Sequence, residues 1–229
     1  MKHPSIPIPA KLLSRPNRFL GIADLNGVKT QCFIPNPGRM HELMEPGTNV
    51  YLIHRPGDHR KTEYDLTLVE YNDTLVSIDS RLPNHMLKEA IDKAQLPEFH
   101  GYKVQRTEPT YHDSRLDLLL SNGETQILLE AKSCTLVENK VALFPDAPTK
   151  RGARHMNTLT HALHHGRASA CFIIQREDAE EWRPNHLMDP EFTENLRKAV
   201  KSGVEAYAYT CDITLEGANI KKRIPVNLE

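Results

Sequence analysis

The clearest chemical signal in the sequence lies in RLDLLLSNGETQILLEAKS, residues 115–133. Asp117 interrupts an apolar run, where a carboxylate is costly unless it is paired or bound to a cation. Glu130 and Lys132 follow on the next apolar stretch, two positions apart. Two carboxylates beside a lysine can hold a hard cation and assist the displacement of a phosphodiester.

An Asn-Gly dipeptide at 122–123 predicts a hairpin turn of two residues that brings these side chains together. In that register Asp117 stands opposite Leu128, and the period of two places Leu128, Glu130 and Lys132 on one face. Glu130 is then the diagonal neighbour of Asp117, about 7–8 Å away at the backbone. The hairpin therefore delivers all three polar groups to one surface.

Asp117 and Glu130 are the predicted ligands of Mg²⁺ or Mn²⁺, because these ions prefer oxygen donors and keep several waters. Lys132 is predicted to orient a water or to stabilise developing negative charge. The short spacing also fits a plain salt bridge between Asp and Lys at a strand end.

A helix predicted over about 150–165 carries the second group of candidates. Met156 and Leu159 share its apolar side. The opposite side carries the residues expected to contact phosphate, which are Arg151 and Arg154, with His155 at its edge. A merely solvated face is the alternative, although such a face normally mixes Lys with Glu.

The elements before these motifs are short strands separated by turns. Strands are predicted at 18–25, 28–34, 49–54, 64–71 and 74–79. Five such strands suit a small OB-type barrel, and an SH3-like barrel would have almost the same pattern.

An OB barrel can bind a single strand by stacking bases on aromatic side chains above a basic groove. The candidates for that role are Phe19, Phe33 and Tyr51, together with Arg18 and Arg39. Packing in the barrel core is the alternative role of the three aromatic rings.

After Pro83 the period changes to that of a helix, with Asn84 as its expected cap, and strands then alternate with helices. The pattern predicts an α/β domain over residues 83–229 that follows a barrel over residues 1–82.

The formal net charge of −1 hides a strong segregation of charge. Residues 1–62 carry nine Lys and Arg against four acidic residues, and residues 147–176 carry five Lys and Arg with no acid. Such blocks favour a local anionic partner such as nucleic acid, although a solvated surface would also account for them.

Composition narrows the class of protein further. The four cysteines lie far apart without a C-x-x-C pair, which argues against a zinc ribbon. No stretch approaches the roughly 18 apolar residues of a membrane span, and the proline-rich start does not resemble a signal peptide. We therefore expect a cytoplasmic protein with no membrane partner.

Residues 130–159, EAKSCTLVENKVALFPDAPTKRGARHMNTL, closely resemble the signature of the sugar fermentation stimulation protein A family. Further matches to that family occur in order at residues 15–27, 35–40, 82–91 and 220–228. The resemblance implies an N-terminal OB-like barrel, a C-terminal domain similar to PD-(D/E)xK nucleases, and DNA binding.

Several residues acquire expected roles through this resemblance. Those that match the nuclease-like motif are Asp117, Glu130 and Lys132, with Glu89 as the acid of the upstream helix. Arg151 and His155 match the family's R-G-x-x-H segment. A nuclease dependent on Mg²⁺ or Mn²⁺ is thus expected. The alternatives are a non-catalytic DNA-binding regulator of sugar metabolism genes, and a module for small ligands or proteins.

Overall fold

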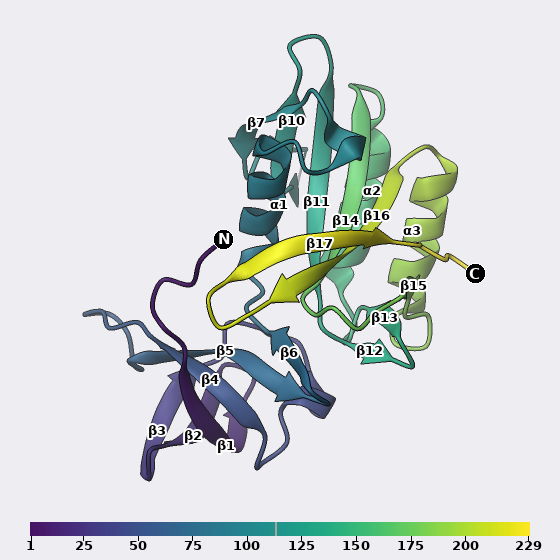
Figure 1. Ribbon diagram of the computed structural model, residues 1–229. Coiled ribbons are helices and arrows are strands. Elements are labelled where there is room, and N and C mark those ends of the chain that lie inside the picture. The colour runs from purple at the N-terminus through teal and green to yellow at the C-terminus, as the bar shows by residue number, and fades with distance from the viewer. Residues whose placement is uncertain (113) are drawn as a thin grey trace.

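The computed structural model describes residues 1–112 and 114–229. An N-terminal barrel lies beneath an α/β domain, and the lower end of the large sheet points toward the barrel (Figure 1). This architecture agrees with the expected OB-like barrel followed by an α/β domain.

Five strands close the barrel and a sixth extends it. They are β1 (Ile8–Asn17), β2 (Leu20–Leu25), β3 (Val28–Phe33), β4 (Asn49–His54), β5 (Tyr64–Tyr71) and β6 (Thr74–Ser77). The order is β3-β2-β1-β4-β5-β6, and pairing of β3 with β5 closes the first five into a ring. A short 3₁₀ turn, His41–Leu43, lies between β3 and β4.

Two details of the barrel differ from the prediction. The strand Ile8–Asn17 was missed, because Pro9 and Pro16 interrupt the pattern that normally marks a strand. Proline is tolerated here because the strand bends, with register irregularities against β2. The segment expected as the fifth barrel strand is β6, which among the described strands pairs with β5 alone and lies outside the closed ring.

The α/β domain is built on a six-stranded sheet in the order β17-β16-β14-β11-β10-β7. Its strands are β7 (Lys103–Thr107), β10 (Leu118–Ser121), β11 (Gln126–Cys134), β14 (Arg167–Ile174), β16 (Glu205–Ile213) and β17 (Ala218–Ile224). The central strands β11, β14 and β16 are parallel, and the outer ones are antiparallel to their neighbours. The smaller pieces are β8 (Thr110–Tyr111) with β9 (Ser114–Arg115), and β12 (Val137–Glu138), β13 (Val141–Phe144) and β15 (Glu181–Pro184).

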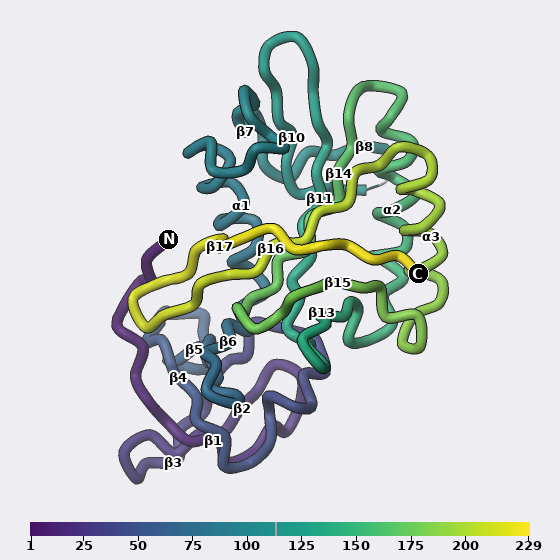
Figure 2. Tube along the Cα trace, turned by 45° about the vertical axis from the view of Figure 1, so that its right-hand side comes forward, coloured from purple at the N-terminus to yellow at the C-terminus, as the bar shows by residue number. Residues whose placement is uncertain are grey.

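Helices cover both faces of this sheet (Figures 1 and 2). They are α1 (Leu82–Asp92), α2 (Lys150–Ala162) and α3 (Pro190–Lys201), with a 3₁₀ turn at Pro97–Phe99. On one face α1 buries Leu87 and Ile91 in a cluster with Leu129 of β11. On the other face α2 and α3 enclose a second core that contains Phe172 and Trp182. The sheet therefore lies between two apolar layers.

One carboxylate caps both helices of the second layer. Asp189 Oδ1 accepts the backbone N–H of Phe192 at the start of α3, 2.9 Å away. Its Oδ2 accepts the N–H of Thr149, 2.7 Å away, and the Thr149 hydroxyl caps α2 through the N–H of Gly152. Because a helix start has unsatisfied N–H groups, these bonds fix where α2 begins.

Direct contacts join the barrel to the α/β domain. Ser77 of β6 donates its backbone N–H to the carbonyl of Gln175, and its hydroxyl to the Gln175 side chain, both at 3.0 Å. The guanidinium of the buried Arg176 lies 5.3 Å from the ring centre of Tyr71. Among the described residues, no helix is long and apolar enough to cross a membrane.

Candidate functional site

The hairpin of β10 and β11 places Asp117 and Glu130 directly across from each other. Ser121 pairs with Gln126, so the turn spans four residues rather than the two that were expected. The cause is Asn122, whose Oδ1 accepts the backbone N–H groups of residues 124 and 125. The pairing moves by two positions, and a shift of two leaves every side chain on its predicted face.

Asp117, just before β10, is held by two donors. Asn84 Nδ2 donates to Asp117 Oδ1 at 2.7 Å, and the backbone N–H of Ala131 donates to Oδ2 at 2.8 Å. Burial, followed by the nearby charge of Glu130, raises the pKa of Asp117 to about 6, against the opposing effects of Lys132 and the two donors. This carboxyl therefore changes its charge close to neutral pH.

Glu130 is almost completely buried, with 2% of the residue exposed. Its Oε1 accepts hydrogen bonds from Lys132 Nζ and from His155 Nδ1. Burial alone would raise the pKa of Glu130, but Lys132 and His155 outweigh it, so the pKa is lower than usual. Its Oε2 is also buried and has no hydrogen-bond partner among the described residues.

His155 of α2 is hydrogen-bonded to Glu130 and is itself held by Arg151. Arg151 Nε donates to His155 Nε2 at 3.3 Å. Since a guanidinium only donates, this bond favours a lone pair on Nε2 and a proton on Nδ1 toward Glu130, although Lys132 Nζ also lies 3.4 Å from Nδ1. His155 therefore helps to fix the orientation of Glu130.

These groups open into a cleft of about 400 Å³ between the barrel and the α/β domain. Asp117, Glu130 and Lys132 line this cleft, and we call this part of its lining the floor. Arg18 of the barrel lies on one wall, and Arg151 of α2 lies on the wall of the α/β domain. The segment between β13 and α2, with a cis peptide bond before Pro145, completes the lining.

Other predicted residues lie outside this cleft. Glu89 pairs with Lys93 at 2.5 Å and with the N-terminal amine at 3.1 Å, because its position on α1 points it toward the chain start. Arg154 is exposed but does not line the cleft, and Arg39 lines a neighbouring hollow. His155 was expected to contact phosphate, but only 1% of the residue is exposed, so it cannot do so in this conformation.

Asn84 is the residue that sequence reasoning did not place at the site. It was interpreted as a helix cap, but α1 begins at Leu82, so Asn84 lies within the first helical turn. From there its amide reaches Asp117. An amide early in a helix is a common pattern, and only its contact with the Asp117 carboxylate, 33 residues further along the chain, gives it meaning.

The donor set fits a hard divalent ion. Two carboxylates face each other and one oxygen, Glu130 Oε2, is buried without a partner in the described part of the chain. No group of three or more His, Cys, Asp or Glu that could hold a metal is found among those residues. A pair of carboxylates suits ions that keep part of their water shell, such as Mg²⁺, better than it suits zinc.

The protein is thus a closed OB-type barrel joined to a mixed α/β domain, with two carboxylates and a lysine in the cleft between them. The profile of the domain described as "Sugar fermentation stimulation protein RE domain" matches residues 81–217. That of the "SfsA N-terminal OB domain" matches residues 13–78. The chain belongs to the sugar fermentation stimulation protein family.

Relatives match the chain along nearly its whole length. A sugar fermentation stimulation protein homolog from Moorella thermoacetica is 49% identical over 211 residues, which is 90% of each chain. One from Natranaerobius thermophilus is 43% identical over 227 residues, 97% of this chain and 95% of the relative. The solved structure of Pyrococcus furiosus SfsA in complex with Ca²⁺ has a TM-score of 0.91 and 31% identity, covering 99% of this chain and 98% of the other.

Proposed function

We propose that the protein is a divalent-metal-dependent nuclease that binds DNA in the cleft and hydrolyses a phosphodiester bond there. The observation that supports this most strongly is the facing pair Asp117 and Glu130 beside Lys132 on the cleft floor. A buried carboxylate oxygen usually has a hydrogen-bond partner, and one without a partner is available to a cation. Glu130 Oε2 is such an oxygen among the described residues.

Asp117 and Glu130 would hold Mg²⁺ or Mn²⁺. The relative from Pyrococcus furiosus is described in complex with Ca²⁺, an ion that takes oxygen ligands as Mg²⁺ and Mn²⁺ do. When bound, such an ion neutralises charge on a phosphate and makes a coordinated water more acidic. This supports a metal of the same chemical class in the present cleft.

The chain's own residues prepare the cleft for a phosphate. Lys132 Nζ lies at the floor, where its positive charge can offset negative charge that develops on a phosphate oxygen. His155 holds Glu130 in place, and the lowered pKa keeps that carboxylate ionised at neutral pH. Asn84 and the Ala131 N–H hold the Asp117 carboxyl in a fixed orientation.

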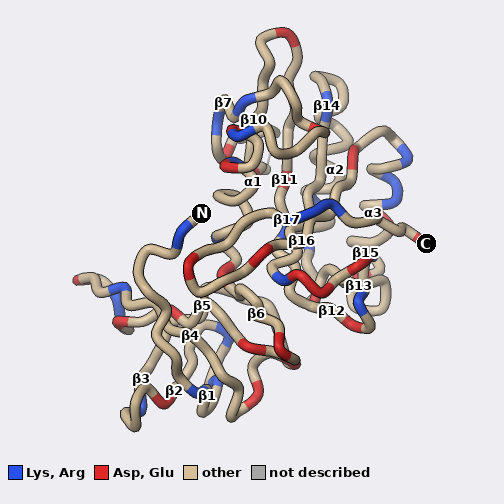
Figure 3. The backbone as a smooth tube through the Cα atoms, viewed as in Figure 1, with Lys and Arg blue, Asp and Glu red and all other residues tan. Residues whose placement is uncertain are grey.

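DNA is the proposed partner because arginines flank the acidic floor. Arg18 and Arg151 can contact the phosphates on either side of the one at Lys132. Arg39, in the adjoining hollow, and Arg154, exposed on α2, extend these contacts. In Figure 3 basic and acidic positions are interleaved over both domains, so binding depends on these local charges rather than on one uniform face.

A cleavage assay on end-labelled single- and double-stranded DNA tests the proposal. We expect products with Mg²⁺ or Mn²⁺ but none with EDTA. Lys132→Met should reduce the rate by roughly 100-fold or more, the usual effect of removing one group that stabilises charge. The matched control is Lys140→Met, an exposed lysine paired with Glu180 outside the cleft. A salt-sensitive mobility shift without any metal-dependent product would instead identify a non-catalytic DNA-binding protein.

Metal affinity should depend on pH through Asp117. Its pKa of about 6 lies above the ordinary value, and only the ionised carboxylate binds a cation. Affinity should therefore level off above about pH 7 and fall roughly tenfold for each unit below the pKa. Titration calorimetry with Ca²⁺ in the absence of DNA measures this, and Asp117→Asn, which removes a proposed ligand, should weaken binding at every pH. Equal affinity at pH 5 and pH 7 would contradict the assignment of Asp117.

A further inference from the structure

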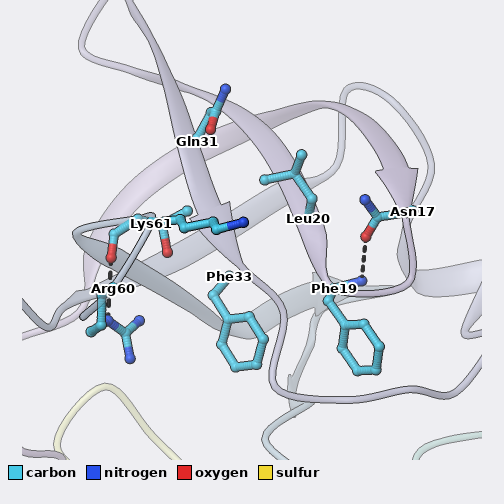
Figure 4. Close-up of a pocket in the computed structure, with 8 residues that line it drawn as sticks. Asn17, Phe19, Leu20, Gln31, Phe33, Arg60 and Lys61 are labelled. Atoms are coloured by element: carbon cyan, nitrogen blue, oxygen red, sulfur yellow. Dashed lines mark hydrogen bonds between the residues drawn. The ribbon is translucent and has the colours of Figure 1, made fainter.

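A second hollow of about 520 Å³ lies on the barrel, away from the carboxylates, and two phenylalanines form part of its wall. The rings of Phe19 and Phe33 are nearly parallel, with 13° between their planes and 6.2 Å between their centres. Figure 4 shows them side by side, with their faces turned the same way. We call this pair the aromatic platform.

Packing of the barrel does not account for the aromatic platform. Neither ring belongs to the buried core of the barrel, and Phe19 is 49% exposed. Asn17 Oδ1 accepts the backbone N–H of Phe19 at 2.9 Å, which holds the turn between β1 and β2 in place. A large apolar ring held at the surface by its backbone favours an interaction with a partner.

The surroundings of the platform are positively charged. The Arg60 guanidinium carbon lies 5.9 Å from the ring centre of Phe33, and Lys61 borders the same hollow (Figure 4). Among the described residues, no side chain that lines this hollow is acidic. An anionic partner with flat apolar faces would match both properties.

The charge of Arg60 is only partly neutralised. Three arginines, Arg55, Arg60 and Arg81, share the buried carboxylate of Asp65. Arg81 also pairs with Asp79. Three guanidiniums against two carboxylates leave a positive surplus beside the aromatic platform.

The platform is connected to the cleft through a third hollow of about 500 Å³. Asn17 lines both the platform's hollow and this one. Arg18 and Gly38 line both this hollow and the cleft. Arg39 also lines the connecting hollow, which has no acidic lining residue in the described part of the chain. The platform, the arginines and Asp117 therefore lie in three hollows that share lining residues with one another.

We propose that the aromatic platform binds unpaired bases of a single-stranded nucleic acid, whose backbone passes the arginines toward the cleft. A base can stack on an aromatic ring only if its own face is exposed. In a duplex, neighbouring bases cover the faces of each base, whereas a single strand leaves them accessible. Tyr51, the third aromatic candidate, does not line this hollow and bonds to Glu70 instead. Binding of bases to the platform does not depend on the proposed function. Only the statement that the bound nucleic acid continues into the cleft rests on it.

Binding of a labelled single strand of about 10 nucleotides, within the usual site size of an OB fold, tests the platform. Fluorescence anisotropy is measured in EDTA, so that neither cleavage nor metal is required. Phe19→Ala should weaken binding about tenfold, as expected when one stacked base is lost. Phe19→Trp should restore it. Val28→Ala, at an exposed apolar position of the same barrel, is the matched control and should have no effect.

Comparison with a duplex of the same sequence separates the possible results. We expect Phe19→Ala to leave duplex binding unchanged, and single-stranded RNA in parallel shows which sugar is preferred. Unchanged binding of the single strand would overturn the inference, even if the protein cleaves DNA. An equal loss for single strand and duplex would also overturn it, because stacking on unpaired bases predicts a difference. If the protein bound the single strand as expected but did not cleave DNA with metal, only the proposed function would be contradicted.

Discussion

Replacing Glu130 with Gln is expected to abolish metal-dependent cleavage and metal binding together. Glutamine has nearly the same volume and keeps an oxygen that can accept from Lys132 and His155, so the fold should persist. It removes the negative charge and replaces one carboxylate oxygen with a donor amide. Loss of a group that merely supports a metal ligand typically costs about 10–100-fold, so loss of a ligand should exceed about 100-fold.

Two measurements on the same Glu130→Gln protein check this result. Titration calorimetry reports Ca²⁺ binding, and the gel assay reports cleavage with Mg²⁺. Glu205→Gln is the matched control, because Glu205 is an ion-paired carboxylate of the same sheet that does not line the cleft. If Glu130→Gln cleaved as fast as the unchanged protein, Glu130 would have no role in catalysis.

Phe172→Ala should have the largest effect on stability. Phe172 is fully buried on β14, and its ring stacks on Trp182 with 3.8 Å between centres. It also contacts Phe144 and Phe192, so its removal leaves a large apolar cavity between the sheet and its helices. We expect the free energy of unfolding to fall by about 3–5 kcal/mol.

Urea denaturation followed by circular dichroism measures this loss. Phe19→Ala provides the comparison, since its ring is half exposed and outside the core, and it should change stability by only about 0.5 kcal/mol. A loss below about 1 kcal/mol for Phe172→Ala would mean that the cavity collapses and the core is less tightly packed than the structure indicates.

The position of the acidic pair was predictable because it depends on a periodicity. The expected turn was two residues too short, yet Asp117 and Glu130 still lie on one face, since a strand repeats every two residues. A turn wrong by one residue would have separated them. The length of the turn itself depends on how the side chain of Asn122 bonds, which local sequence patterns do not determine uniquely.

The supporting contacts could not be predicted, because they join segments that are distant in the sequence. His155 meets Glu130 only because α2 packs against the sheet at one particular rotation. The helical period placed His155 at the edge of a polar face, where a small rotation decides between burial and exposure. Glu89 was expected at the site but lies away from it. Its side chain on α1 pairs with the N-terminal amine and Lys93 rather than approaching Asp117.

The cap formed by Asp189 has a consequence for how the protein matures on the ribosome. The two carboxylates of the hairpin leave the ribosome well before Asp189 does, but the start of α2 is secured by the Asp189 carboxylate. In a nascent chain that ends before this residue, the Thr149 N–H lacks its acceptor, so the start of α2, which carries Arg151 and His155, has one hydrogen bond fewer. The last hydrogen bond at the start of α2 is therefore made later than the hairpin that carries the two carboxylates.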